Sequence, residues 1–508
     1  MPLMYCHAKL KNISQHTVIS AHLFLPDYSP MNSDSFYPAI ACFPLLLMLA
    51  GCAPMHETRQ ALSQQTPAAQ VDTALPTALK NGWPDSQWWL EYHDNQLTSL
   101  INNALQNAPD MQVAEQRIQL AEAQAKAVAT QDGPQLDFSA DMERQKMSAE
   151  GLMGPFALND PAAGTTGPWY TNGTFGLTAG WHLDIWGKNR AEVTARLGTV
   201  KARAAEREQT RQLLAGSVAR LYWEWQTQAA LNTVLQQIEK EQNTIIATDR
   251  QLYQNGITSA VEGVETDINA SKTRQQLNDV AGKMKIIEAR LSALTNHQTK
   301  SLKLKSVALP KVASQLPDEL GYSLLARRAD LQAAHWYVES SLSTIDAAKA
   351  AFYPDINLMA FLQQDALHLS DLFRHSAQQM GVTAGLTLPI FDSGRLNANL
   401  DIAKAESNLS IASYNKAVVE AVNDVARAAS QVQTLAEKNQ HQAQIERDAL
   451  RVVGLAQARF NAGIIAGSRV SEARIPALRE RANGLLLQGQ WLDASIQLTG
   501  ALGGGYKR

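Results

Sequence analysis

The spacing of hydrophobic and polar positions predicts one very long helix in the second half of the chain. The segment from Gly394 to roughly Gly454 contains no proline and almost no glycine. Apolar residues recur in it every three or four positions, which is the spacing of a helix that packs against other helices. These positions are Ala417, Ala421, Val425, Ala428, Val432 and Leu435. At 1.5 Å per residue, this helix would be about 90 Å long, which is too long for a compact globular domain.

A second long helical segment, from Gly187 to about Tyr253, repeats the pattern in the first half. Its apolar positions are Val193, Leu197, Val200, Ala204, Leu214, Val218, Leu221 and Trp225. Short motifs recur at a nearly constant offset. Val218-Ala219-Arg220 matches Val425-Ala426-Arg427, and the turn around Tyr253 and Gly256 matches the turn around Phe460 and Gly463. The chain is therefore predicted to contain an internal duplication.

Each half also contains two segments in which apolar and polar residues alternate, as in strands with one apolar and one polar face. The first pair begins at Gln135 and at Thr174 and is separated by a Gly/Pro-rich loop at 147–171. The second pair begins at Pro354 and at Val382, with a loop at 365–379. We therefore predict a mainly α chain with a small β part of four strands in two hairpins.

The remaining segments are predicted as shorter helices and irregular connections. Residues 53–85 are polar and proline-containing and indicate an extended tether. Helix is expected from Trp88 to about Thr130 with a break near Ala108–Pro109, and again from Asp318 to Phe352. Return helices should end near Asn296 and Leu498, and residues 298–317 should be irregular.

The N-terminal region carries an apolar run, Ala39–Ala50, that is typical of a signal peptide. The run ends in Leu49-Ala50-Gly51-Cys52, which resembles the bacterial lipobox and implies acylation of Cys52 by fatty acids such as palmitate. An ordinary secretion signal is the alternative. A start at Met31 would give an n-region with Asp34 and no Lys or Arg, so residues 1–30 indicate either a long n-region or an over-extended start.

Composition and motifs argue against several classes of protein. The 508 residues have a formal charge of −3 and 18% charged residues, whereas a nucleic-acid-binding protein would carry a strong basic excess. Cys52 would be the only cysteine after cleavage, so neither an intramolecular disulfide nor a cysteine metal site is expected. The chain contains no HExxH, GxSxG or P-loop motif. We therefore expect no catalytic residues, no cofactor and no metal.

Four strands cannot close a barrel around a channel, and an open sheet edge is not tolerated in a membrane. Either the strands are covered or several chains share one barrel, and three chains would supply twelve strands. The polar face of the first strand carries Asp137, Asp141 and Glu143, which predicts an acidic lumen with a preference for cations. Charges at a loop edge outside a pore are the alternative. A soluble coiled-coil protein with two incidental hairpins would leave the lipobox unexplained.

Several motifs together resemble one known family. They are Trp88–Trp89 with Asp94, Trp181-x-Leu183-Asp184-x-Trp186-Gly187, Leu325-x-Arg327-Arg328-x-Asp330-Leu331, Phe352-Tyr353-Pro354 and Leu388-Pro389-Ile390-Phe391-Asp392-x-Gly394-Arg395. From Cys52 to Gly505 the chain resembles the outer membrane factors, which are TolC-like trimeric channels, and specifically their lipoprotein drug-efflux branch. Ala329 departs from the family, in which proline is usual at that position.

The resemblance implies a homotrimer with a twelve-stranded barrel in the outer membrane and an α-helical barrel in the periplasm. It also implies an anchor in outer-membrane lipid through Cys52, a periplasmic adaptor (membrane-fusion) protein and an inner-membrane efflux pump as partners. The channel would be a passive exit duct for drugs. The alternatives are the outer-membrane channel of a type I protein-secretion system, which shares the fold, and a structural periplasmic lipoprotein without a pore.

The resemblance further implies the division of the chain into domains. We expect a signal peptide at 1–51, a lipid-anchored tether and equatorial segment at 52–93, a first helix-strand-strand-helix repeat at 94–297, an equatorial linker at 298–317, a second repeat at 318–499 and a tail at 500–508.

The two helix turns, Tyr253–Thr258 and Phe460–Ala466, would be the periplasmic tips, where the family closes its channel and meets the adaptor. The charged residues just past the tips that would hold the channel shut are Glu262, Glu265, Arg469 and Glu472. Arg469 stands where the best-known member of the family has an acid. We hypothesise that Glu472 pairs with a basic residue of a neighbouring helix. Ordinary solvated helix charges are the alternative.

Overall fold

The computed structural model describes residues 55, 62–65, 79–151, 159–160, 165–166, 168–296, 302–311, 314–317 and 321–506. All of them belong to one structural unit, Ala53–Arg508. The predicted signal peptide and the predicted lipidation site at Cys52 lie outside the described residues.

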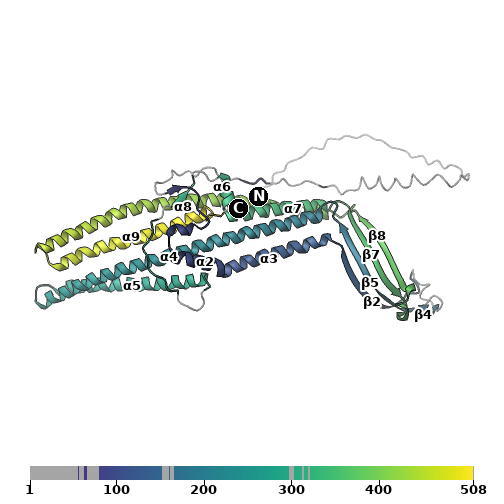
Figure 1. The fold of residues 1–508 in the computed structure, drawn as a ribbon, viewed down its shortest axis with the longest axis horizontal. Coiled ribbons are helices and arrows are strands. Elements are labelled where there is room, and N and C mark those ends of the chain that lie inside the picture. The colour runs from purple at the N-terminus through teal and green to yellow at the C-terminus, as the bar shows by residue number, and fades with distance from the viewer. Residues whose placement is uncertain are drawn as a thin grey trace, which may run out of the picture. The chain divides into compact units, whose positions relative to one another are not determined.

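Two long helical hairpins form most of this unit (Figure 1). Their helices are α4 (Lys188–Gln254) with α5 (Ala260–Leu294), and α8 (Arg395–Asn461) with α9 (Gly467–Ala501). The first helix of each hairpin has 67 residues, about 100 Å at the rise of an α-helix, and the second has 35. Corresponding helices begin and end 207 residues apart, so the predicted duplication is confirmed. Among the described residues, no helix combines the length and the hydrophobicity that a membrane crossing requires.

Shorter helices precede the strands in each half. In the first half they are a 3-10 helix η1 (Trp88–Tyr92), α2 (Asn95–Asn107) and α3 (Pro109–Ala129), with the predicted break at Ala108. In the second half they are α6 (Gly321–Arg327) and α7 (Ala329–Ala350).

The prediction of one continuous helix from Asp318 to Phe352 is therefore wrong. Arg328 has an extended backbone (φ −102°, ψ 116°) and separates α6 from α7. Its guanidinium donates to Asp330 over 2.6 Å and to the carbonyl of Ala501 over 3.2 Å, which holds the break in place. The break forms although Ala329, not proline, begins α7.

Four long strands form one antiparallel sheet in the order β2-β5-β7-β8. They are β2 (Gln135–Lys146), β5 (Trp169–Leu183), β7 (Asp355–Ala366) and β8 (Gln378–Thr387). The four predicted strands are confirmed, although β8 ends before Ile390 because Pro389 has no N–H to donate to a sheet.

Two pairs of short strands were not predicted. β1 (Leu79–Asn81) pairs in parallel with β6 (Ser314–Leu316), and β3 (Asn159–Asp160) pairs with β4 (Thr165–Thr166). Residues 53–85 and 298–317 are therefore not wholly irregular. Strands of two or three residues are too short to show an alternating pattern.

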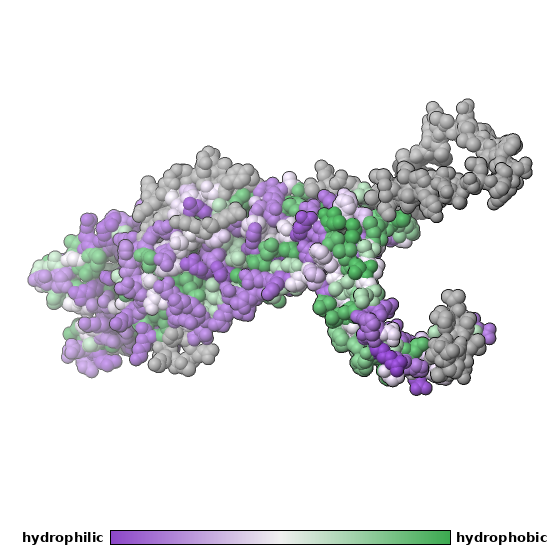
Figure 2. All heavy atoms as spheres, turned by 45° about the vertical axis from the view of Figure 1, so that its right-hand side comes forward, coloured by the Kyte–Doolittle hydropathy of each residue, from purple (hydrophilic) through white to green (hydrophobic). Residues whose placement is uncertain are grey.

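The register of the sheet places most apolar residues of the four strands on one face, whereas Met359 and Phe361 of β7 lie on the other. Directly paired residues share a face, and one row across the sheet reads Leu136, Ala179, Ala360 and Val382. The next row reads Phe138, Leu177, Leu362 and Met380. Figure 2 shows hydrophobic residues gathered over the strands. Phe138 is 67% exposed and Val382 is 82% exposed. An apolar surface of this kind marks contact with lipid or with another protein.

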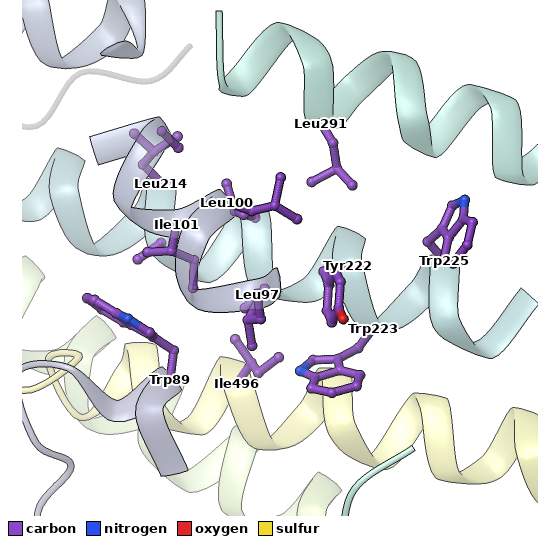
Figure 3. Close-up of a cluster of buried hydrophobic side chains, with 14 of the residues drawn as sticks. Trp89, Leu97, Leu100, Ile101, Leu214, Tyr222, Trp223, Trp225, Leu291 and Ile496 are labelled. Carbon is purple, nitrogen blue, oxygen red and sulfur yellow. The ribbon is translucent and has the colours of Figure 1, made fainter. Parts of the chain in front are cut away.

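A buried cluster joins the N-terminal helices to both hairpins (Figure 3). Trp89, Leu97 and Ile101 from η1 and α2 pack with Tyr222 of α4 and with Ile496 of α9, and all five are at most 2% exposed. The cluster therefore fixes the two hairpins to one N-terminal element.

Residues 62–65 of the predicted tether lie along α8. The backbone N–H of Leu62 donates to Asn408 Oδ1 over 3.0 Å, and that of Gln65 donates to Asn415 Oδ1 over 2.7 Å. Asn415 Nδ2 donates in return to the carbonyl of Ser63. These bonds fix residues 62–65 in an extended path on the helix.

Candidate functional site: helix tips and strand faces

Both helix turns have the same backbone geometry. Gly256 and Gly463 each adopt a φ of 70°, a left-handed conformation that glycine reaches without a steric penalty. The N–H of Gly256 donates to the carbonyl of Tyr253, and that of Gly463 donates to the carbonyl of Phe460, each over 2.9 Å. The predicted tip residues therefore lie at the turns, and both turns end a helix with a glycine cap.

Side chains of the first tip cap the start of α5. Ser259 caps α5, with its Oγ accepting from the N–H of Val261 over 3.3 Å. The Glu262 carboxylate accepts from the N–H of Ser259 over 3.1 Å and from the hydroxyls of Ser259 and Thr258. Hydrogen bonds from Thr258 and Ser259 lower the pKa of Glu262. Glu262 thus stabilises its own turn as part of a capping box, while Glu265 is exposed on α5.

The second tip lacks this capping box. Ala466 and Arg469 occupy the positions that correspond, at an offset of 207, to Ser259 and Glu262. Arg469 instead donates to Glu472 over 2.7 Å, three residues later on α9. Within the described residues of this chain, Glu472 therefore has a basic partner on its own helix, because residues three apart on a helix lie side by side. Pairing of Glu472 with a neighbouring helix stays a hypothesis.

Arg474 connects the two hairpins near their tips. From α9 it donates to Glu241 of α4 over 3.3 Å and to Gln457 of α8 over 3.2 Å. A second bond, from Thr266 Oγ1 to Asp249 over 3.2 Å, joins α5 to α4 within the first hairpin.

The sequence pattern did not predict the tie at Arg474, because the paired residues are 233 positions apart. Comparison of the two halves gives one indication that this position is unusual. The residue that corresponds to Arg474 in the first half is Asp267, so the charge is reversed at this position.

Farther from the tips, the two hairpins are joined by an ion pair beside a polar cleft. Arg220 of α4 forms an ion pair with Asp493 of α9. A cleft of about 730 Å³ lies beside this pair, between α4, α8 and α9. Its charged residues are Arg220, Glu224, Lys438 and Asp493.

The three predicted lumen acids lie along one strand, β2, on the polar face of the sheet. Asp137, Asp141 and Glu143 are exposed. Their cross-strand partners are polar and share that face: Thr178, Thr174 and Asn172. Asp365 belongs to the same face, where it accepts from Thr174 over 3.2 Å. The face opposite the apolar surface therefore carries a cluster of carboxylates, one of which had not been predicted.

The described residues contain no group of three or more His, Cys, Asp or Glu side chains placed to hold a metal ion. The candidate sites are therefore the two faces of the sheet and the two helix turns, whose hairpins are connected through Arg474.

Comparison with known proteins identifies the family. The model of the outer membrane efflux protein family matches residues 100–297 and 320–504 of the chain. The chain belongs to this family. The multidrug resistance outer membrane protein MdtQ of Escherichia coli O157:H7 is 99% identical over 478 residues, which are 94% of this chain and 100% of MdtQ. The multidrug resistance outer membrane protein MdtP of Shigella flexneri is 36% identical over 91% of this chain and 94% of its own length.

Solved structures of outer-membrane proteins share the fold. The outer membrane protein VceC of Vibrio cholerae matches with a TM-score of 0.70 and 26% identity, over 84% of this chain and all of VceC. The outer membrane channel CmeC of Campylobacter jejuni matches with a TM-score of 0.75 and 19% identity, over 90% of this chain and 95% of CmeC.

Proposed function

We propose that the chain is the outer-membrane channel of a tripartite multidrug efflux system, a passive exit duct for toxic compounds. The observation that carries this proposal is a sheet with one mainly apolar face across all four strands and an opposite face that bears the carboxylates of β2 and β7. Membership in the outer membrane efflux protein family and the names of the relatives support the same role.

The duct is a homotrimer. β2 and β8 are the open edges of the sheet, and open edges are not tolerated in a membrane. Pairing β8 of one copy with β2 of the next satisfies both edges, and three copies close a twelve-stranded barrel. The apolar face then contacts lipid, and Asp137, Asp141 and Glu143 line the lumen.

The partners are a periplasmic adaptor protein and an inner-membrane pump that supplies the energy. The hairpin tips around Gly256 and Gly463 are the proposed docking and closing point, with the exposed Glu265 and the half-buried Glu472 near them. The chain itself catalyses no reaction. Acylation of Cys52 anchors the N-terminus in the outer membrane, and residues 62–65 run along α8 from that anchor.

The second candidate, the channel of a type I protein-secretion system, uses the same fold. The names of the relatives, which are multidrug resistance proteins, favour drugs over polypeptides as the exported class.

Drug accumulation tests the proposal. We would measure dyes and antibiotics in cells that lack their other outer-membrane efflux channels, with and without this gene. We expect the gene to lower accumulation, and Cys52→Ser to weaken that effect. Unchanged accumulation together with a new polypeptide in the medium would support the secretion channel. A change in neither would contradict both functions.

A further inference from the structure

The loop between β7 and β8 folds back onto the apolar face of the sheet. The ring of Phe373 lies against that of Phe175, with centroids 5.6 Å apart. A side chain at Gly173 would come within 2.9 Å of Leu369 and 3.5 Å of Leu372. Gly173 and Phe175 alternate with the carboxylate-bearing positions, so both face the apolar side. We call the segment from Leu369 to Phe373 the loop foot.

The loop foot presents large apolar side chains outward. Phe373 is 82% exposed and Leu369 is 49% exposed. In water such exposure has no compensating contact, whereas an aromatic ring at the end of a transmembrane strand fits the boundary between acyl chains and headgroups. The foot therefore extends the apolar face to the ends of the strands that lie away from the helices (Figure 1).

Two basic residues follow the apolar positions of β2 on this same face. The alternation places Leu136, Phe138, Ala140 and Met142 on the apolar side, and the next two positions on that side are Arg144 and Lys146. Both basic residues are exposed. Successive residues on one face of a strand are about 7 Å apart. Arg144 therefore lies about 7 Å beyond Met142 along β2, and Lys146 lies the same distance beyond Arg144.

The pairing across to β5 places these charges beside the foot. Met142 pairs with Gly173, over which the foot lies. Arg144 pairs with Thr171, and Lys146 pairs with Trp169. Arg144 is therefore one step beyond the foot, and Lys146 stands opposite an aromatic side chain.

The paired strands β2 and β5 place no acid beside the two charges on the apolar face. Glu143 lies on the opposite face of β2, because neighbouring residues of a strand alternate. The cross-strand partners of Arg144 and Lys146 are the uncharged Thr171 and Trp169. Asp371 of the foot already accepts from Arg374 over 3.0 Å. On these two strands the apolar face therefore ends in two positive charges.

We propose that Arg144 and Lys146 bind the phosphate groups of outer-leaflet lipids, while Phe373 and Leu369 contact the acyl chains of the same lipids. Arginine binds phosphate through paired N–H donors and lysine acts as a point charge, so the two together suit a phosphorylated headgroup. A lipid fits better than free phosphate because the charges continue directly from an apolar surface. The inference rests on the proposed function for the placement of the sheet in the membrane.

Native mass spectrometry of the purified full-length protein tests the site. The probe is bis-phosphorylated lipid A, compared with its dephosphorylated form. Arg144→Gln with Lys146→Gln should weaken binding of the phosphorylated form about tenfold or more, as expected for losing charge-assisted hydrogen bonds, and should leave the dephosphorylated form unaffected. The matched control is Lys283→Gln with Lys285→Gln, which removes the same charge from exposed positions on α5.

Phe373→Ser provides an independent readout. It should weaken binding of both forms of lipid A equally, because it removes an acyl-chain contact and no charge. Equal binding of phosphorylated lipid A by wild type and the Arg144/Lys146 variant would overturn the site. Displacement of lipid A by millimolar inorganic phosphate would overturn its assignment to lipid.

Bilayer conductance distinguishes a failure of the proposed lipid site from a failure of the proposed channel function. Wild type and the Arg144/Lys146 variant should conduct equally, because both charges face away from the lumen. A wild-type protein that binds lipid A through these residues but carries no current would instead overturn the channel proposal.

Discussion

Arg474 on α9 donates a hydrogen bond to Glu241 on α4 over 3.3 Å, and the two residues belong to different helical hairpins. Glu241 is the less exposed partner, with 18% of its side chain accessible against 43% for Arg474. Gln457 on α8 accepts from the same guanidinium. The second hairpin is therefore tied to the first near the tips, where a channel built from these helices would close.

Breaking this tie should make the channel leak. We expect Arg474→Gln and Glu241→Gln to sensitise cells several-fold to vancomycin, an antibiotic too large to cross an intact outer membrane readily. Arg447→Gln is the matched control, because Arg447 donates to Gln444 of its own helix. Minimal inhibitory concentrations give the comparison, and wild-type resistance in both tie variants would show that the tie does not hold the tips together.

The Arg469–Glu472 pair should matter less than the Arg474–Glu241 tie. It is an exposed pair on one helix, and such pairs contribute about 0.3–0.5 kcal/mol. Glu472→Ala should therefore change conductance in planar bilayers much less than Glu241→Gln does. Equal opening by the two substitutions would place a second partner of Glu472 on another chain.

The row of carboxylates on the polar sheet face should make the pore prefer cations. Neutralising it with Asp137→Asn, Asp141→Asn and Glu143→Gln removes three negative charges and should shift the reversal potential in a salt gradient toward zero. Asp110→Asn with Glu122→Gln, at exposed positions on α3, is the control and should leave the potential unchanged. Anion selectivity in the wild type would contradict the assignment of this face to the lumen.

The bond between Asp94 and Tyr222 should stabilise the junction of the N-terminal helices with α4. Asp94 caps α2 by accepting from the N–H groups of Gln96 and Leu97, and it accepts from Tyr222 Oη over 2.7 Å. Tyr222→Phe removes this bond and the bond that Tyr222 Oη accepts from Gln96 Nε2, and should cost about 1–3 kcal/mol. Asp94→Ala also removes the cap, which adds about 1 kcal/mol. Thermal unfolding should rank wild type above Tyr222→Phe and Asp94→Ala lowest, and a reversed order would contradict this assignment.

Stability should fall in alkaline solution because of partly buried tyrosines. Burial and the hydrogen bond to Glu206 raise the pKa of Tyr337 from 10.0 to about 12. The folded protein keeps this proton while the unfolded chain loses it, so the free energy of unfolding should decrease as pH rises from about 10 to about 12. Tyr337→Phe should show a shallower decrease in denaturant unfolding between these pH values. An unchanged slope would show that Tyr337 does not contribute.

The elements that the sequence predicted well are those with long, regular periods. α4 and α8 follow from their apolar spacing, and the two glycine turns follow from the repeat. The alternation in β2 also placed Asp137, Asp141 and Glu143 on one face, and the register then showed that face to be shared by all four strands.

The features that the sequence did not predict depend on contacts between distant residues. The break at Arg328 is held by Ala501, which is 173 positions away, and the Arg474–Glu241 tie joins two repeats. The spacing of Ser259 and Glu262 is that of a capping box and could have predicted the capping role of Glu262. It was missed because the charged residues of both tips were interpreted in the same way. The loop foot at Phe373 has no periodic signal at all, because its position follows from folding back onto β5.

Current across a planar lipid bilayer tests the central claim most directly. Purified wild-type protein and its Arg474→Gln variant would be added to separate bilayers under the same salt gradient. We predict discrete current steps with a cation-selective reversal potential, and larger steps from the Arg474→Gln variant. Inserted, trimeric protein that gives no steps in either form would contradict the account of this chain as an efflux channel.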